Sequence, residues 1–221
     1  MRDWKDFDKF YNKIVSDIYH EPDSLLTMQV VDKMLPGFLD ILRDKNSRIL
    51  DVGCGSGYAL EKMKERGFEN VEGLTLNDED IKDVTKRGFK VHQIDFNFMD
   101  FKDEFNAVWM RHALEHSPFP FYTIWKLNII LKNGGLLYVE MPQPHIDRLK
   151  NSERILEKFP NHYSIMGSEM YKSLFSRAGF RLVQHDEIFL SNMKQPGKTE
   201  TFNETYDWYL LQKVEDVAND D

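Results

Sequence analysis

The sequence predicts an α/β protein in which about seven strands form one doubly wound, mainly parallel sheet. Short apolar segments with strand character alternate with segments of helical periodicity from residue 48 to residue 212. Such alternation is typical of βαβ units, whose strands run parallel. The chain has 221 residues, of which 41% are hydrophobic, and this length suits one well-buried domain with an appendage. We therefore expect a single domain over residues 1–221.

Two helical segments precede the first strand and predict an N-terminal helical layer over residues 1–45. Residues 3–20 place apolar and aromatic side chains three and four positions apart, which gives one apolar helix face. A second helix is expected to begin at Asp23 or Ser24, and Pro36-Gly37 is expected to interrupt it. We interpret the second helix as a packing layer on the sheet, whereas the first could either pack or form a lid.

The remaining elements follow from apolar runs bounded by capping residues and glycines. The expected strands are 49–52, 71–76, 89–94, 106–110, 136–139, 180–188 and 206–212, and the expected helices are 58–66, 77–88, 121–131 and 168–179. The segment 141–167 stands outside this alternation, and Pro142 and Pro144 stiffen its start. It predicts a cap insertion after strand five, helical over 146–159, followed by a C-terminal half of the sheet at 168–215.

Composition excludes several classes of protein. The formal net charge is −8 and no dense cluster of Lys and Arg occurs, so we expect no nucleic-acid partner. No apolar run is long enough for membrane insertion, and the charged N-terminus does not resemble a signal peptide. The single cysteine, Cys54, excludes an internal disulfide framework and favours a reducing, cytoplasmic location.

The stretch from Arg48 to Gly57, RILDVGCGSG, joins the first strand to the first helix of the sheet. Its glycines alternate at Gly53, Gly55 and Gly57. Missing side chains let a ligand approach the backbone, and the following helix presents free N–H groups to it. The spacing is G-x-G-x-G, whereas the dinucleotide fingerprint requires G-x-G-x-x-G. An ordinary tight turn does not need three alternate glycines after an acidic strand end, here Asp51.

This turn resembles motif I of the class I S-adenosylmethionine-dependent methyltransferases. FNAVWMRHALEH resembles the fourth strand of that family and NGGLLYVEMP its fifth, so the resemblance runs from about Arg48 to Gln212. It implies a class I methyltransferase fold, S-adenosyl-L-methionine as the cofactor and residues 46–140 as the cofactor-binding half. The cofactor-binding residues expected on this basis are Asp51, Gly53, Cys54, Gly55, Gly57, Tyr58, Thr75, Leu76, Asp80, Asp95, Phe96, Arg111 and His112.

Within this set, the resemblance implies that Asp95 holds the adenine amino group and that Phe96 contacts the ring. Most members of the family end strand two with an acid that binds the ribose, but this chain has Thr75 there. The segment GLTL instead resembles the cyclopropane-fatty-acid-synthase branch, in which a polar residue one helical turn later assists. Asp80 occupies that place, and it is equally suited to an ordinary position in the first turn of a helix.

A competing pattern is His112-Ala113-Leu114-Glu115-His116, which matches the H-x-x-E-H motif of inverted zinc peptidases. On a continuous helix, both imidazoles would face one zinc ion. However, His112 follows a strand, prolines lie just beyond His116, and no third ligand is evident in the sequence. We therefore expect no metal, with His112 lining the cleft while Glu115 and His116 brace the turn.

The sequence thus predicts methyl transfer from S-adenosylmethionine to an unidentified small-molecule acceptor. His112 and His162 are candidates to assist deprotonation of the acceptor, and Glu140 and Tyr163 are candidates to orient it. His145 in the cap insertion is a further polar candidate. The alternatives are a non-catalytic S-adenosylmethionine-binding module and the zinc peptidase. The acceptor atom and the oligomeric state do not follow from the sequence.

Overall fold

A computed structural model describes residues 4–15, 23–102, 104–144, 161–194 and 201–217. Seven strands form one sheet in the order β3-β2-β1-β4-β5-β7-β6. The strands are β1 (Ile49–Val52), β2 (Val71–Thr75), β3 (Lys90–Gln93), β4 (Phe105–Arg111), β5 (Leu131–Pro142), β6 (Phe180–Lys194) and β7 (Thr201–Lys213). β1 to β5 pair in parallel, and β7 is antiparallel to both β5 and β6. The predicted mainly parallel, seven-stranded sheet is confirmed.

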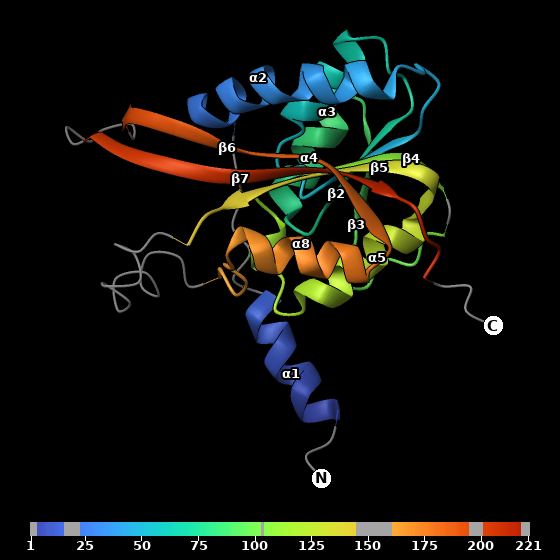
Figure 1. Cartoon of the computed structure of the whole chain (residues 1–221), viewed down its shortest axis with the longest axis vertical. Coiled ribbons are helices and arrows are strands. Elements are labelled where there is room, and N and C mark those ends of the chain that lie inside the picture. Colours follow the sequence, from blue (N-terminus) through green and yellow to red (C-terminus); the bar gives the residue numbers. More distant parts are fainter. Residues whose placement is uncertain (1–3, 16–22, 103, 145–160, 195–200, 218–221) are drawn as a thin grey trace.

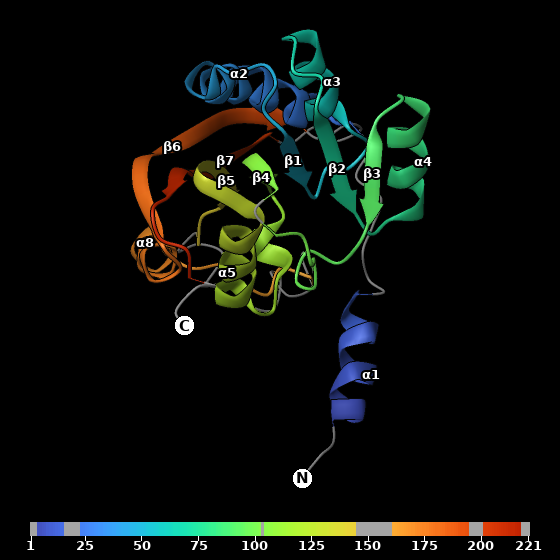
Figure 2. The same ribbon diagram turned by 90° about the vertical axis from the view of Figure 1, so that its right-hand side faces the viewer.

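Helices cover both faces of the sheet, with α2 and α3 on one face and α5 and α8 on the other (Figures 1 and 2). The helices are α1 (Trp4–Val15), α2 (Leu25–Leu42), α3 (Tyr58–Glu65), α4 (Asp78–Lys86), α5 (Pro120–Ile130) and α8 (Ser168–Arg177), with a 3-10 turn η1 (Leu114–His116). The helix α1 projects away from the body of the molecule (Figure 2). The chain is therefore doubly wound, with the switch in strand order between β1 and β4.

Side-chain caps fix the starts of two helices that border the site. The Ser24 hydroxyl accepts a hydrogen bond from Thr27 N, and the Asn77 side chain accepts from Glu79 N and Asp80 N. The expected break at Pro36-Gly37 is wrong, because α2 runs unbroken through Pro36. Buried side chains on both sides of the proline, among them Leu35 and Phe38, hold the helix against the sheet, and this packing outweighs the lost backbone hydrogen bond.

Two apolar cores lie on opposite faces of the sheet. One packs α2, α3 and α4 around the stacked rings of Trp109 and Tyr138, whose centroids are 3.9 Å apart. The other packs α5 and α8 against the strands through buried side chains such as Leu127 and Phe175. β1 and β4 are buried on both faces of the sheet, and most of their side chains are therefore apolar. The sheet is thereby fixed as a rigid support for the residues at its carboxyl edge.

The last two strands are longer than expected. β6 continues to Lys194 and β7 begins at Thr201, so they form a long antiparallel hairpin that extends past α2 (Figure 1). The helix expected at 146–159, together with His145, lies outside the described residues. Of the cap insertion, the structure describes 141–144 and 161–167. Among the described residues, no helix combines the length and the apolar character needed to span a membrane.

Candidate functional site

The glycine-rich turn after β1 has a backbone that glycine alone adopts easily. Gly53, Gly55 and Gly57 have φ angles of +75°, +49° and +93°. A Cβ added at Gly53 would lie 2.7 Å from the Cβ of Ala113, so the turn also passes too close to its neighbour for a side chain. The backbone N–H groups of residues 53 and 54 both donate to Leu74 O, at 2.8 and 3.1 Å. These bonds hold the turn at the carboxyl edge of the sheet.

Two clefts open on either side of this turn and share Gly53 and Gly55. The larger, of about 610 Å³, is lined by Gly53, Gly55, Leu74, Thr75, Leu76, Asp80, Ile94, Phe96, His112, Ala113, His116 and Asn161. The smaller, of about 410 Å³, is lined by Asp23, Thr27, Val31, Asp51, Gly53, Cys54, Gly55, Ser56, Tyr58, Ala59, Trp109 and Arg111. Together they form a continuous surface at the carboxyl ends of the parallel strands, where α/β sheets bind ligands.

The smaller cleft contains a buried carboxyl group, that of Asp51, and a largely buried guanidinium group, that of Arg111. Asp51 is 3% exposed, and its burial raises the pKa of the carboxyl to about 7 although Arg111 opposes the rise. Arg111 extends toward the sheet, where its Nε lies 2.8 Å from Glu140 Oε1. Asp51 is therefore an acid whose charge would be stabilised by a cationic ligand group in this cleft.

Thr75 and Asp80 meet in the larger cleft, as the resemblance implies for a ribose site. The Thr75 hydroxyl donates to Asp80 Oδ2 at 3.4 Å, and both residues are buried. Asp80 also takes the helix-start place, because its backbone N–H donates to the capping Asn77 at 3.2 Å. The two interpretations of Asp80 are thus compatible, since its backbone belongs to the cap and its side chain lines the cleft.

The carboxylate of Asp95, which was expected to bind the adenine amino group, already accepts hydrogen bonds from other residues of the protein. Its Oδ2 accepts a hydrogen bond from the Tyr11 hydroxyl of α1 at 2.5 Å, and its Oδ1 accepts from the backbone and side chain of Asn97. The Tyr11 ring stacks on Phe119 with centroids 5.9 Å apart. Asp95 does not line either cleft, whereas Phe96 does. The sequence did not predict that Tyr11 contacts Asp95. The aromatic pattern of residues 3–20 also did not distinguish a lid from a packing helix.

His112 has an unusual backbone at the end of β4, with a φ angle of +47°. Such a conformation is costly for a residue with a Cβ and is concentrated at functional sites. The His112 N–H donates to Glu140 O at 2.8 Å, and its ring lies 3.2 Å from Glu115 Oε1 and 3.4 Å from Glu140 Oε1. Burial and Arg111 lower the pKa of His112, but the two carboxylates outweigh them and raise it to about 9.

Glu140 has no exposed surface. Its carboxylate lies between Arg111 and His112 and accepts a hydrogen bond from the Tyr138 hydroxyl at 2.9 Å. Burial raises the pKa of Glu140, but Arg111 and His112 outweigh burial and hold it below its ordinary value. Glu140 therefore acts on the cleft through Arg111 and His112, which line it, and not by direct contact.

The H-x-x-E-H segment does not form the continuous helix that a zinc peptidase needs. His112 lies just beyond the last residue of β4, Arg111, and within 112–116 only Leu114–His116 form a short 3-10 turn. The turn instead brings Glu115 and His116 close to His162. The potential ligand atoms of these three side chains all lie within 4.8 Å of one another. Tyr163, next in the chain, is 40% exposed. Sequence analysis named His162 but did not connect it with Glu115, because 46 residues separate them in the chain.

Comparison with known proteins agrees with this geometry. Residues 26–185 match the family described as "Methyltransferase domain". The chain belongs to this methyltransferase family. It is 25% identical over 195 residues, 83% of the chain and 57% of the relative, to the tRNA U34 carboxymethyltransferase of Proteus mirabilis. It is 23% identical over 64% of the chain and 56% of the relative to the 27-O-demethylrifamycin SV methyltransferase of Amycolatopsis mediterranei. The chain thus spans a little over half the length of these relatives.

A solved structure supports the class I fold. A SAM-dependent methyltransferase from Archaeoglobus fulgidus superposes with a TM-score of 0.64 at 21% identity, covering 84% of this chain and 94% of that one. The cofactor of this family and fold is S-adenosylmethionine. The residues present suit it, because Gly53 and Gly55 line both clefts with backbone alone and buried Asp51 offers a carboxylate for a cationic group.

Proposed function

We propose that this protein transfers a methyl group from S-adenosylmethionine to a small-molecule acceptor. The observation that carries the proposal is the glycine turn, whose positive φ angles expose bare backbone to both clefts at the carboxyl edge of the sheet. The turn divides the site into a side with Asp51 and Arg111 and a side with Thr75, Asp80 and Phe96. We assign the methionine portion of the cofactor to the first side and the adenosine to the second.

The bound cofactor supplies an electrophilic methyl on a sulfonium. A lone pair of the acceptor would take that methyl while sulfur keeps the electrons of the broken carbon–sulfur bond, and the proton of a protonated acceptor would pass to His112 or His162. The protein's part is to align donor and acceptor and to exclude water. His112, which lines the larger cleft next to Gly53, is the residue placed to meet the acceptor.

For the acceptor side, we propose that His112 or His162 assists deprotonation, with Glu140 and Tyr163 as orienting residues. Because the pKa of His112 is raised to about 9, His112 can take a proton only above that pH, and turnover that depends on it should rise with pH. The contacts divide these roles. Glu140 fixes His112 through its backbone and its ring, at 2.8 and 3.4 Å. His162 lies beside His116, with ring centroids 4.8 Å apart. Tyr163 is the exposed member of the group and is suited to contact an acceptor that arrives from solvent.

We favour a small acceptor because the net charge of −8 opposes a polyanion. The Proteus relative is named for tRNA U34, and the Amycolatopsis relative for a rifamycin. A methyl-transfer screen with radiolabelled cofactor should therefore include hydroxylated small molecules and total tRNA. Labelling of tRNA alone would contradict the small-molecule assignment. Tight cofactor binding with no turnover on any acceptor would favour the non-catalytic binding module.

The cofactor assignment is tested by Gly55→Val. Gly55 lines both clefts, and we expect a valine side chain there to occupy the space of the methionine portion of the cofactor, so calorimetry should detect no S-adenosylmethionine binding. The matched control is Gly88→Val, since Gly88 has a φ angle of +82° and a Cβ there would meet nothing within 4 Å. The control carries similar backbone strain away from the site and should bind the cofactor normally. Unchanged binding in folded Gly55→Val would refute the assignment.

The role of His112 is tested by two substitutions once an acceptor is known. His112→Gln retains a hydrogen-bond donor but cannot exchange a proton, whereas His112→Ala loses both functions. If His112 takes the proton, both variants should lose turnover by about 100-fold while cofactor affinity changes little. If it only orients the acceptor, His112→Gln should retain most turnover. Full turnover in both variants would show that His112 neither takes the proton nor orients the acceptor, and that proximity of donor and acceptor alone accounts for the rate.

A further inference from the structure

Three side chains converge behind the larger cleft, and the proposed methyl transfer gives them no joint role. They are Glu115 and His116 of η1 and His162 of the following loop, and their ligand atoms lie within 4.8 Å of one another. We propose that Glu115, His116 and His162 bind a first-row divalent cation, such as zinc, at the wall of the cofactor cleft. The expectation of no metal in the sequence rested on a missing third ligand, and the fold supplies it.

Glu115 is the first reason for the proposal. Its side chain is 1% exposed, and within the described part of the chain neither carboxylate oxygen receives a hydrogen bond. His112 lies 3.2 Å from Oε1, and although burial raises the pKa of Glu115, His112, His116 and His162 together hold it below its ordinary value. A fully buried carboxylate without hydrogen-bond donors is costly unless charged partners or a metal compensate it. The carboxylate therefore has coordination capacity that the described protein groups leave unused.

His116 is the second reason, because its tautomer is already set for coordination. Its Nδ1 lies 3.1 Å from the backbone carbonyl oxygen of Asn161. A carbonyl can only accept, so Nδ1 carries a proton, and in the neutral ring Nε2 is then the nitrogen able to coordinate a metal. Metal-binding histidines nearly always donate their second ring nitrogen in this way, which fixes both the ring and its tautomer. His116 also lines the larger cleft, as does Asn161.

The loop that carries His162 is the third reason, because it is tied directly to Glu115. The backbone N–H groups of Tyr163 and Ser164 both donate to Glu115 O, at 2.8 and 3.0 Å, and the Ser164 hydroxyl donates to Ser117 O. These bonds bring two segments that are far apart in sequence into one rigid unit. The site is therefore prearranged by the backbone and does not depend on side-chain reach alone.

Two imidazoles and one carboxylate form a ligand set of the kind that zinc accepts in catalytic sites, which keep a fourth position for water or substrate. Tetrahedral ligands about 2.1 Å from zinc are roughly 3.4 Å apart. The distances between the ligand atoms of the three side chains, at most 4.8 Å, therefore need to shorten by little more than an ångström. Magnesium is disfavoured, because it prefers oxygen ligands in an octahedron. If the proposed methyl transfer is correct, an acceptor oxygen could occupy the open position, and the cation would lower its pKa. His162 would then be a ligand and not a base, which leaves the role of base to His112.

The test measures metal binding itself, so it succeeds or fails independently of methyl transfer. The full chain is stripped with chelator and titrated with Co²⁺ and, by calorimetry, with Zn²⁺. We expect one equivalent of each ion at micromolar affinity or tighter, and visible cobalt absorption typical of a tetrahedral site with nitrogen and oxygen ligands. No absorption and no heat with the wild-type chain would overturn the proposal, whatever its activity.

Three variants assign the ligands. Glu115→Gln, His116→Ala and His162→Ala should each weaken zinc binding by about 100-fold or more, since even loss of an outer-shell partner costs 10- to 100-fold. The matched control is His185→Ala, because His185 also pairs with a buried carboxylate, Asp207, at 2.9 Å. The control should bind zinc as the wild type does. Circular dichroism and thermal denaturation in the presence of chelator verify folding, and wild-type affinity in the folded His162 variant would overturn the site.

Discussion

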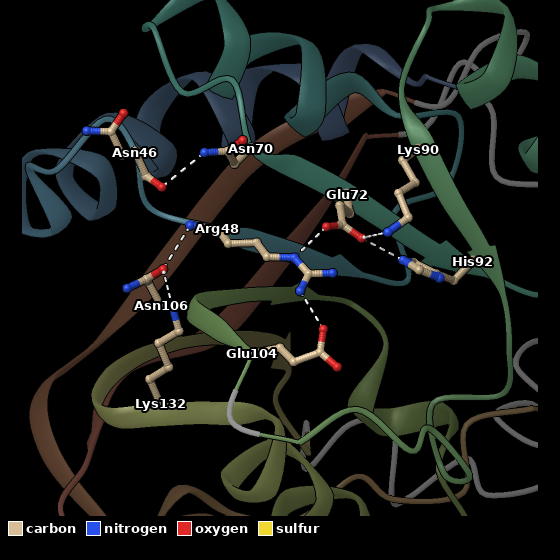
Figure 3. Close-up of polar contacts among 9 residues, drawn as sticks. All are labelled: Asn46, Arg48, Asn70, Glu72, Lys90, His92, Glu104, Asn106 and Lys132. Atoms are coloured by element: carbon tan, nitrogen blue, oxygen red, sulfur yellow. Dashed lines mark hydrogen bonds and ion pairs between the residues drawn. The ribbon is translucent and has the colours of Figure 1, made fainter.

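Two buried carboxylates at opposite ends of the same sheet have very different surroundings. Glu72, near the amino end of β2, is met by Arg48 Nε at 2.6 Å, Lys90 Nζ at 2.9 Å and His92 Nε2 at 2.7 Å (Figure 3). Glu115, beyond the carboxyl end of β4, has His112 at 3.2 Å and no hydrogen bond to its carboxylate within the described residues. Both side chains are buried.

The difference separates a structural role from a functional one. Every oxygen of Glu72 is used, so this cluster holds the amino ends of the strands together and has nothing left for a ligand. At the carboxyl edge, the burial of Asp51 is compensated incompletely, which raises its pKa and is a cost to folding, whereas the charge of Glu115 is compensated by nearby histidines. Such costs are found where a ligand later supplies the missing interaction. The comparison predicts opposite responses to mutation at the two ends.

The largest effect is expected from Glu72→Ala, which should lower the free energy of unfolding by about 3 kcal/mol. Removing one partner of a buried ion pair typically costs 3–5 kcal/mol, and the lower end applies because Arg48 and Lys90 reach solvent. Urea denaturation measures the loss, and cofactor binding should be unchanged. A loss below about 1 kcal/mol would show that the cluster is not structural.

The same cluster predicts a pH dependence. Burial raises the pKa of Glu72, but its three cationic partners outweigh burial and lower it from 4.5 to about 2. Because the folded pKa is depressed, the stabilisation is fully present above pH 4.5 and is lost as pH falls toward 2. The stability difference between the wild type and Glu72→Gln should therefore shrink over this window. A constant difference between pH 5 and pH 2.5 would contradict the ion-pair explanation.

Asp51→Asn should act in the opposite direction and stabilise the cofactor-free protein. The folded pKa of Asp51 is raised from 3.8 to about 7, so its contribution to stability is full below pH 3.8 and is lost as pH rises through 7. Asparagine stays neutral, and the variant should gain on the order of 2 kcal/mol over the wild type above pH 7. Thermal denaturation at pH 5 and pH 8 measures the gain, and cofactor affinity should fall.

Glu115→Gln should lower the free energy of unfolding by about 1 kcal/mol in the presence of chelator. This loss is smaller than that expected of Glu72→Gln, because the ion pair of Glu115 is with His112 at 3.2 Å, whereas Glu72 has three cationic partners at 2.6 to 2.9 Å. This contrasts with Glu72→Ala, although Glu115 is the more buried of the two. Urea denaturation of Glu115→Gln and Glu72→Gln side by side sharpens the comparison. A loss of 3 kcal/mol or more at Glu115 would place it in the structural class with Glu72.

Much of the fold could be predicted because its signals are local. Alternating apolar segments, the Asn77 and Ser24 caps and the glycines at helix ends depend on neighbours in the chain. The break at Pro36 could not be judged locally, since tertiary packing holds α2 together. Most residues that line the two clefts were also predictable, because the glycine turn and the strand ends are fixed by topology. Of the expected cofactor residues, Gly57 and Asp95 do not line either cleft.

The acceptor side was less predictable because its contacts join distant segments. His116 and His162 meet through a loop bound to the Glu115 carbonyl, and no spacing in the sequence encodes that contact. The positive φ angle of His112 is equally invisible, since most residues with that conformation are glycines. Ala113 and Asn161, which complete the larger cleft, carry no chemical signal of their own. Geometry, and not residue type, identifies them.

The smallest effect is expected at Tyr11, and it decides the role left open for the first helix. The Tyr11 hydroxyl donates to Asp95 Oδ2, the carboxylate that the resemblance implies for the adenine amino group. If α1 competes with the cofactor, Tyr11→Phe should remove that competitor and strengthen S-adenosylmethionine binding several-fold, since one net hydrogen bond contributes about 1 kcal/mol.

If α1 instead closes over bound cofactor as a lid, Tyr11→Phe should weaken binding by a similar factor, because the lid loses its anchor while its stacking on Phe119 remains. Calorimetry distinguishes the two signs. Asp95→Ala provides the scale, since loss of a charged hydrogen-bond partner costs about 1.5–3 kcal/mol and should weaken binding by about ten-fold or more. Equal affinities in Tyr11→Phe and the wild type would assign α1 to packing alone.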